Sequence, residues 1–371
     1  MQKNVNPKVT IQNFPEDIQC LPRRRFVQGL FGVAAAAVWP SFKLSGIIPS
    51  FSCLKNTAVK LEGIEAGEES FWKLVKNQFM IREGLIMMNA ANLCPSPYSV
   101  QHRMFELTRD VDIDVSYNNR NKFYDLQEES RNALARYLGA SPEEIAITRN
   151  TSESNNMVIN GLTFKRGDEV VIWDENHPTA NEAWNVRAER YGFTVKRVRM
   201  PAIFSKSEEL IQSFVDAITP RTRLLCFSHV SNLSGIALPV REICRTAHER
   251  NILVHVDGAQ TFGLYKIDLH DLQCDFYTGS AHKWFVGPKE VGVLYVRKEL
   301  IANLWPTIVG VGYPDVLDKG ARKFETLGQR DDSKIAAMAA AVRFHETIGP
   351  ARIEARVRSL TAELKCRLRA R

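Results

Sequence analysis

The chain has 371 residues, of which 44% are hydrophobic and 25% are charged. These proportions are typical of a folded globular protein and exclude a collagen, a low-complexity polymer and a polytopic membrane protein. The length leaves room for two or three domains around a large core. The formal net charge of +7 raises the question of an anionic partner such as a nucleic acid.

The positive charge is concentrated at the two ends of the chain. Residues 1–60 hold eight lysines and arginines against two acidic residues, and residues 351–371 hold seven against two. The rest of the chain therefore carries a net charge of −4. A body of that charge does not favour a nucleic-acid-binding protein, so we expect no nucleic acid as a partner.

The N-terminal charge belongs to a pattern of its own. Arg23, Arg24 and Arg25 precede an apolar run of about a dozen residues (29–39), too short to cross a bilayer, which needs roughly 20 apolar residues. We therefore expect no stable membrane span. The pattern resembles a twin-arginine (Tat) signal, which predicts a signal and linker over residues 1–60, recognition by the Tat export machinery and a periplasmic or exported protein. The alternative is a basic turn leading into an alanine-rich helix of a cytoplasmic protein.

The seven cysteines show neither a disulfide framework nor metal-ligand spacing, so we expect no metal site. Cys226, Cys244 and Cys274 lie among apolar neighbours, which predicts that they are buried as small hydrophobic side chains.

After the N-terminal arm, short strand-like runs alternate with helix-like stretches. Strands are predicted at 144–148, 169–173, 194–199, 223–229, 252–257, 276–278 and 292–296, and helices at 121–138, 179–191, 207–218 and 240–250. This alternation predicts an α/β fold with a mostly parallel sheet sandwiched by helices. Ligands of such sheets bind beyond the carboxyl ends of the strands, so motifs that directly follow strands are the strongest candidates for a site.

Two such motifs carry the chemistry. Asp257 ends an apolar strand, where an unpaired carboxylate is costly and calls for a cationic partner, and Lys283 follows the next strand within Ser280-Ala281-His282-Lys283. A protonated pyridine nitrogen would be such a partner. The pair fits pyridoxal phosphate (PLP), with Lys283 as the Schiff-base lysine and Asp257 keeping the ring nitrogen charged. A structural lysine after a strand is the alternative for Lys283.

At these residues the sequence resembles the class V aminotransferase family of fold type I PLP enzymes, which contains cysteine desulfurases and isopenicillin N epimerase. The resemblance runs from about residue 89 to about residue 348. It implies PLP as cofactor, an amino acid as small-molecule substrate and a homodimer. It also implies an external aldimine, removal of the Cα proton and a quinonoid intermediate. The outcome can be epimerisation, C–S lysis, desulfuration or transamination.

The resemblance also assigns further site residues. Thr151 and Ser152 would bind the phosphate at a helix N-terminus, although alone they read as an ordinary N-cap. His177 would stack on the cofactor ring and relay protons, and as a lone histidine before proline it could instead be a loop residue. The other assigned residues are Asn232 beside the substrate, Gln260 at the phenolic oxygen, and Ser280 and His282 at the phosphate. A turn cap is the alternative for Asn232, and a core position for His282.

Two loops complete the resemblance. Residues 88–97 match the family's substrate-side loop, in which Cys94 is expected to be a free loop thiol and not a sulfur acceptor. Residues 324–331 match a segment of the epimerase-like branch, which favours the isopenicillin N epimerase-like reaction. The family's threonine there reaches the partner subunit's phosphate, and this chain has Gln329 instead.

The predicted organisation of the remainder has three parts. Residues 61–120 form an N-terminal segment with the substrate-side loop, residues 121–310 the PLP-binding large domain, and residues 311–371 the start of a C-terminal small α+β domain. This last part is expected to be incomplete, with residues 349–371 as one charged helix. A PLP-fold protein that binds without catalysing remains the alternative to an enzyme.

Overall fold

The computed structural model describes residues 69–201 and 203–370. These residues belong to one compact unit, Ala58–Arg371, and the predicted export signal lies outside the described part of the chain. Within that part, no helix combines the length and the apolar composition that crossing a bilayer requires.

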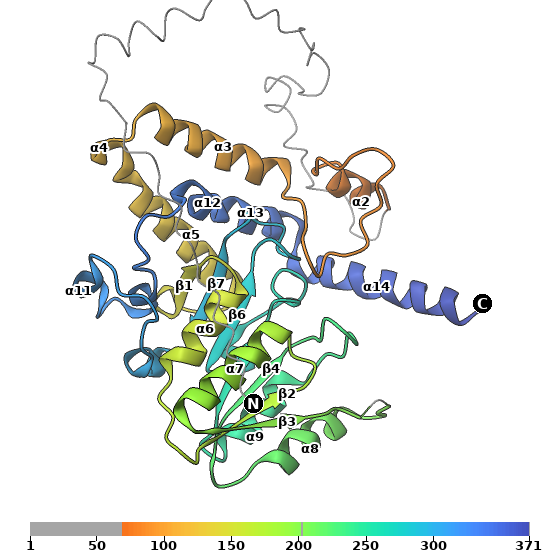
Figure 1. The fold of residues 1–371 in the computed structure, drawn as a ribbon. Helices are drawn as coiled ribbons and strands as arrows, with labels where there is room; N and C mark the ends of the chain where they lie inside the picture. Colours follow the sequence, from red (N-terminus) through yellow and green to blue (C-terminus); the bar gives the residue numbers. More distant parts are fainter. Residues whose placement is uncertain (1–68, 202, 371) are drawn as a thin grey trace, which may run out of the picture. The chain divides into compact units, whose positions relative to one another are not determined.

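A seven-stranded sheet forms the centre of the fold, in the order β1-β7-β6-β5-β4-β2-β3 (Figure 1). The strands are β1 (Ile145–Thr148), β2 (Glu169–Trp173), β3 (Thr194–Val198), β4 (Thr222–Ser228), β5 (Leu253–Asp257), β6 (Phe276–Ser280) and β7 (Gly292–Val296). Only β7 runs against its neighbours β1 and β6, while the pairs from β6 to β3 are all parallel. The seven predicted strands and the mostly parallel sheet are confirmed.

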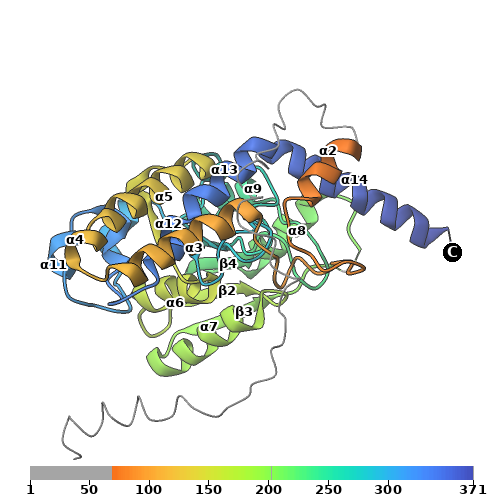
Figure 2. The same ribbon diagram turned by 90° about the horizontal axis from the view of Figure 1, so that it is seen from above.

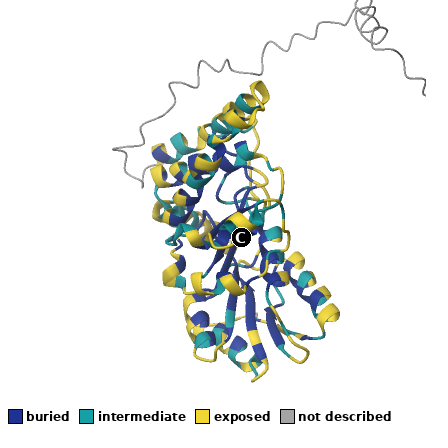
Figure 3. Cartoon of the chain, turned by 90° about the vertical axis from the view of Figure 1, so that its left-hand side faces the viewer, coloured by how far each residue is buried: buried dark blue, intermediate teal, exposed yellow. Residues whose placement is uncertain are grey.

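Successive side chains of a strand point to opposite sides, and both faces of the sheet are buried except at the edge strand β3, which is partly exposed. In β2, Val171 and Trp173 join one hydrophobic cluster, and Val170 and Ile172 join the other. Figure 3 shows most of the strand residues in the buried colour and the outer sides of the helices in the exposed colour. Near-continuous apolar runs are therefore what these strands require.

Helices cover the sheet on both sides (Figures 1 and 2). The first face packs against α3 (Tyr98–Ile113), α5 (Lys122–Leu138), α8 (Ser207–Ala217), α9 (Val240–His248), α12 (Asp332–Ala336) and α13 (Met338–Ile348). The second face packs against α6 (Thr151–Gly161), α7 (Pro178–Tyr191), and the 3₁₀ helices η3 (Lys298–Asn303) and η4 (Gly320–Phe324). The four predicted helices correspond to α5, α7, α8 and α9.

The remaining helices lie at the periphery. They are α2 (Glu69–Lys76), α4 (Tyr117–Arg120), η2 (Pro142–Glu144), α10 (Leu269–Leu272), α11 (Tyr313–Val316) and α14 (Pro350–Arg369). The predicted helix at 349–371 is confirmed as α14, which has no buried residue and extends away from the sheet in Figure 2. An ion pair between Arg356 and Glu69, 2.7 Å long, ties α14 to α2.

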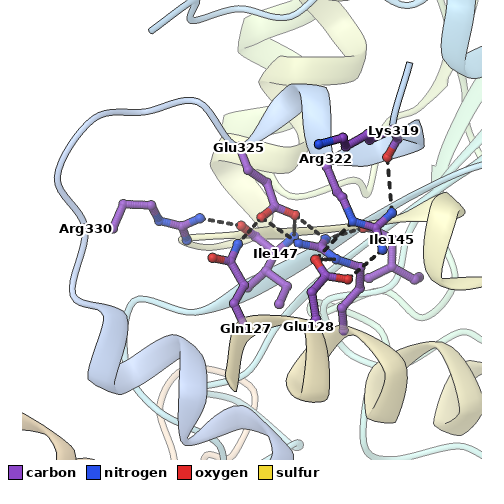
Figure 4. A network of polar contacts seen from close by, with 9 residues as sticks. Gln127, Glu128, Ile145, Ile147, Lys319, Arg322, Glu325 and Arg330 are labelled. Carbon is purple, nitrogen blue, oxygen red and sulfur yellow. Dashed lines mark hydrogen bonds and ion pairs between the residues drawn. The ribbon is translucent and has the colours of Figure 1, made fainter. Parts of the chain in front are cut away.

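A buried ion pair anchors the segment after η4 to the edge of the sheet (Figure 4). The side chains of Arg131 on α5 and Glu325 are only 1% and 6% exposed, and both guanidinium ends of Arg131 donate to the Glu325 carboxylate. That carboxylate also accepts from the backbone amide of Ile147 on β1 at 2.7 Å, and from Gln127. Burial acts to lower the pKa of Arg131, but the negative charge of Glu325 and its hydrogen bonds help to outweigh it, so the net shift is upward and the guanidinium stays charged.

Candidate active site

The predicted site residues line one cavity of about 450 Å³. Every one of them follows a strand at its carboxyl end, which is where parallel sheets bind ligands. They are Thr151 and Ser152 after β1, His177 after β2, Asn232 after β4, Asp257 and Gln260 at and after β5, and Ser280, His282 and Lys283 at and after β6. The structure thus brings the whole predicted set together, and the role of each residue stays a prediction.

Asp257 is held by two donors at the bottom of this cavity. Its side chain accepts from the Ala259 amide at 2.9 Å and from the Asn155 carboxamide at 2.9 Å. Asn155 in turn accepts from the Thr278 hydroxyl at 2.7 Å. The carboxylate is therefore buried, oriented and without a basic ion-pair partner within 4 Å among the described residues, which leaves it available to a cationic group of a ligand.

Asn155 is the main site residue that the sequence analysis passed over. It lies one helical turn after Thr151, so both side chains lie on the same face of α6. A buried asparagine on that face, 2% exposed, was the available signal. Its oxygen also lies 3.1 Å from Nε2 of His255, whose pKa burial lowers to about 3, so His255 is a neutral buried group.

The N-terminus of α6 forms a group of hydrogen-bond donors at the cavity. Asn150 caps the helix by accepting from the Glu153 amide at 2.9 Å. The Thr151 amide donates to Ser280 Oγ at 2.8 Å, and the two hydroxyls lie 2.7 Å apart. The Thr151 amide is thus paired within the protein, and the predicted role of Thr151 at the phosphate stays a prediction. The hydroxyls, the Ser152 amide and the positive end of the helix remain as an anion-binding surface.

The surroundings of Lys283 lower the pKa of its amine, which favours its action as a nucleophile. Burial lowers the pKa of its amine, and the negative charge of Asp257 opposes that shift. A lowered pKa increases the neutral fraction of the amine, which is the form that attacks a carbonyl carbon. Burial and the positive charges of Lys283 and Lys289 lower the pKa of His282, so this imidazole is a neutral neighbour.

His177 lies at the exposed side of the cavity and caps α7. Its Nδ1 accepts from the Thr179 amide at 3.3 Å, so in the neutral ring the proton is on Nε2. Pro178 begins α7 directly after it, and the fixed proline φ suits the first helical position. The position as helix cap explains the sequence His-Pro-Thr and leaves Nε2 for a ligand.

Asn232 lies exposed on the turn after β4 and lines the cavity. Ser231, not Asn232, caps this turn, because Ser231 Oγ accepts from the amides of Leu233 and Ser234. The Ser231 hydroxyl itself donates to Glu175. The alternative role of Asn232 as turn cap is therefore wrong.

The substrate-side loop reaches the cavity with Asn89, Ala91 and Asn92. Gln260 donates from Nε2 to the Ala91 carbonyl at 3.2 Å and so ties this loop to the end of β5. Cys94 is free, as predicted, but it is buried, and burial raises its thiol pKa to about 11. A thiol with that pKa is almost wholly protonated at neutral pH and is a poor sulfur acceptor.

The 324–331 segment lies beside a second cavity, of about 730 Å³. Gln329 is exposed there, and its Oε1 accepts from Arg120 at 3.0 Å. Arg330 donates to the carbonyl of Ile147 at 2.7 Å (Figure 4). None of the predicted cofactor-binding residues lines this larger cavity, so the chemistry belongs to the smaller one.

The smaller cavity fits PLP in chemistry. A helix N-terminus with hydroxyls suits the phosphate, Asp257 suits a protonated ring nitrogen and Lys283 suits the aldehyde. The residue after Asp257 is Gly258, and a Cβ at this position would lie 2.0 Å from the Tyr277 ring. Only glycine therefore allows the turn after Asp257 to pack directly on β6.

Comparison with known proteins agrees with the site. The sequence pattern of the aminotransferase class-V family matches residues 99–371. Isopenicillin N epimerase of Streptomyces clavuligerus is 30% identical over 303 residues, 78% of this chain and 76% of the epimerase. A probable cysteine desulfurase of Methanothermobacter thermautotrophicus is 30% identical over 289 residues, 75% of this chain and 71% of that protein.

A solved structure gives the same result for the fold. A C-DES mutant with glycine covalently linked to the PLP cofactor superposes with a TM-score of 0.68 and 26% identity, covering 74% of this chain and 75% of that one. The chain therefore belongs to the class-V aminotransferase family, and pyridoxal phosphate is its cofactor.

Proposed function

We propose that this enzyme epimerises the α-carbon of an amino acid, in the manner of isopenicillin N epimerase. The observation that carries the proposal is the cavity that collects Lys283, Asp257 and His177. It is supported by two relatives of that name, from Streptomyces clavuligerus and Amycolatopsis lactamdurans, 30% and 31% identical to this chain.

PLP, when bound, withdraws electrons from the Cα–H bond of an amino acid attached to it. Asp257 keeps a proton on the ring nitrogen, because its two donors fix the carboxylate and its burial strengthens the attraction. Lys283 would hold the cofactor through its amine, and the same amine, whose pKa burial lowers, would be the base that removes the Cα proton.

Epimerisation also needs a proton delivered to the opposite side of Cα. Nε2 of His177 carries the ring proton in the neutral tautomer and lies at the mouth of the cavity, so we assign the second proton transfer to His177. This assignment distinguishes an epimerase from a lyase, which needs a base and a leaving group but no second acid at Cα.

The test is incubation of the PLP-loaded enzyme with L-amino acids in deuterium oxide, followed by chiral separation and mass spectrometry. The proposal expects both enantiomers at Cα with deuterium incorporated, and loss of all exchange in Lys283→Ala. A His177→Phe variant should exchange the proton of the L-substrate while forming little D-product.

Other products would identify the alternatives. Sulfide with alanine indicates a desulfurase, a keto acid with ammonia a lyase, and a keto acid formed only with a second keto acid an aminotransferase. The desulfurase alternative is favoured by the relative from Methanothermobacter thermautotrophicus. Retention of PLP with no exchange of any amino acid would indicate a protein that binds without catalysing.

Two further parts of the proposal rest on the sequence pattern. The arginines at 23–25 and the apolar run after them support export by the Tat route, which carries folded proteins and would allow PLP to be inserted first. Recovery of the protein with an intact N-terminus in the cytoplasmic fraction would contradict export.

The exposed position of Gln329 supports contact with a second copy of the chain. Sedimentation of the loaded enzyme tests this part, and a monomer at all concentrations would contradict it.

A further inference from the structure

Trp284, the residue after the cofactor lysine, is hydrogen-bonded to Gln260 and has no role in the proposed reaction. Its indole Nε1 donates to Gln260 Oε1 at 2.9 Å. At the other end of the same carboxamide, Gln260 Nε2 donates to the Ala91 carbonyl at 3.2 Å. Gln260 is only 7% exposed, and both bonds are partly buried.

These two partners determine the orientation of the carboxamide. An indole N–H can only donate and a backbone carbonyl can only accept, so the oxygen of Gln260 must face Trp284 and its NH₂ must face Ala91. Rotation of the carboxamide by half a turn would break both bonds and place an amide N–H against an indole N–H. The assignment therefore follows from the two partners and not from a choice between similar atoms.

The NH₂ end lies on the cavity side of the carboxamide. Ala91 and Gln260 both line the cavity, whereas Trp284 does not. The second N–H of Gln260 Nε2 has no partner among the described residues, so one donor is left at the cavity wall. The oxygen, which would repel an anionic ligand atom, is turned away.

We propose that Trp284 is a positioning residue that fixes the carboxamide of Gln260 with its NH₂ toward the cavity, so that Gln260 donates to the phenolic oxygen of PLP. The inference rests on PLP as the cofactor and on no particular reaction. A donor at the phenolic oxygen stabilises its anionic form and so lowers the pKa of the nitrogen that joins Lys283 to the cofactor.

The substrate-side loop is bonded, directly or through Gln260, to residues on both sides of Lys283 in the sequence. The Cys94 amide donates to the carbonyl of His282 at 2.7 Å, just before the lysine. Trp284, just after it, holds the loop through Gln260 and Ala91. Loss of the indole N–H should therefore loosen residues 89–94 even in the cofactor-free protein.

The test compares Trp284→Phe, which removes the N–H and keeps an aromatic ring, with Trp305→Phe as control at a tryptophan that is 67% exposed. The readout is the pH midpoint of the visible absorption change of the lysine-bound cofactor, measured without substrate. Trp284→Phe should raise this midpoint by up to about one pH unit, because a hydrogen bond to a charged atom is lost or reversed. The control should titrate like the parent enzyme.

A double variant separates positioning from general loosening. Gln260→Leu should raise the midpoint at least as far, and adding Trp284→Phe to it should change nothing more. Hydrogen exchange of the peptide over residues 85–94, in cofactor-free protein, should be faster in both single variants. An unchanged midpoint in a folded Trp284→Phe enzyme would overturn the inference, and so would full additivity of the two changes. If Trp284→Phe fails to fold, Gln260→Leu alone must show both effects.

No outcome of this test depends on which amino acid the enzyme converts. A failed epimerase assay would leave the titration informative, and an unchanged titration would leave the proposed reaction standing.

Discussion

Replacement of Glu325 by glutamine tests the buried ion pair that anchors the segment after η4. The change keeps the shape of the side chain but removes its charge, and it turns one acceptor oxygen into a donor. Glu325 accepts from both ends of the Arg131 guanidinium, from the Ile147 amide and from Gln127. A glutamine can satisfy only part of this set, and its NH₂ would face other donors.

The magnitude follows from the burial of the partner that remains. Removing one member of a buried pair costs about 3 to 5 kcal/mol, since the other charge stays desolvated. Arg131, 1% exposed, keeps a second carboxylate, Glu128 at 2.9 Å, but Glu128 also binds Arg322. We therefore expect the lower end, about 3 kcal/mol. For a unit as long as Ala58–Arg371, 1 kcal/mol shifts Tm by about 1.5 °C, so the loss lowers Tm by roughly 4 to 5 °C.

The assay is thermal unfolding of the PLP-loaded enzyme, followed by circular dichroism. The matched control is Glu346→Gln, the same change in an Arg–Glu pair whose side chains are 61% and 37% exposed, where at most about 1 kcal/mol is expected. If Glu325→Gln lowers Tm no more than Glu346→Gln does, the buried pair does not stabilise the native state and the reasoning fails.

Three further changes have expected outcomes. Asn155→Ala should weaken PLP retention and lower the free energy of unfolding by about 1 to 3 kcal/mol, because the buried Asp257 carboxylate loses a donor. Equilibrium dialysis measures the retention and urea unfolding the stability. The control Asn160→Ala, at an exposed position of the same helix, should change neither. Reductive methylation of the cofactor-free enzyme, resolved by peptide mass spectrometry, should modify Lys283 with a pH midpoint below the ordinary lysine value of about 10.4; a midpoint at or above it would contradict the shift. Gln273→Gly should raise the free energy of unfolding by about 1 kcal/mol, because residue 273 caps the C-terminus of α10 with a φ of 58° that glycine adopts without strain. Gln212→Gly, inside α8, should lower it by about the same amount. If urea unfolding shows that both variants change stability in the same direction, this account of backbone strain is refuted.

The sheet and the main site residues were predictable from the sequence because they depend on local signals. A run such as 170–173 is apolar at every position, which is what a strand buried on both faces needs. Asp257 and Lys283 directly follow such runs, so the topology of parallel strands places them at one edge.

The supporting contacts were not predictable, because they join residues far apart in the chain. Asn155 meets Asp257 across 102 residues, and the Thr151 amide donates to Ser280 across 129 residues. Nothing in the local pattern of either partner indicates the other. The role of Trp284 is hidden for the same reason, since an indole beside a buried apolar motif reads as core until its N–H finds Gln260.

The place of β1 in the sheet has a consequence for synthesis on the ribosome. β1 pairs only with β7, although residues 149–291 lie between these strands. Closing that loop carries an entropic cost that is offset only once β7 has been made, so β1 is the last of the strands to dock. α6, whose N-terminus follows β1, gains its final neighbours at the same moment. A nascent chain in which β7 has not yet left the ribosome should therefore be unable to retain the cofactor. Binding of pyridoxal phosphate is then expected late in the synthesis of the chain.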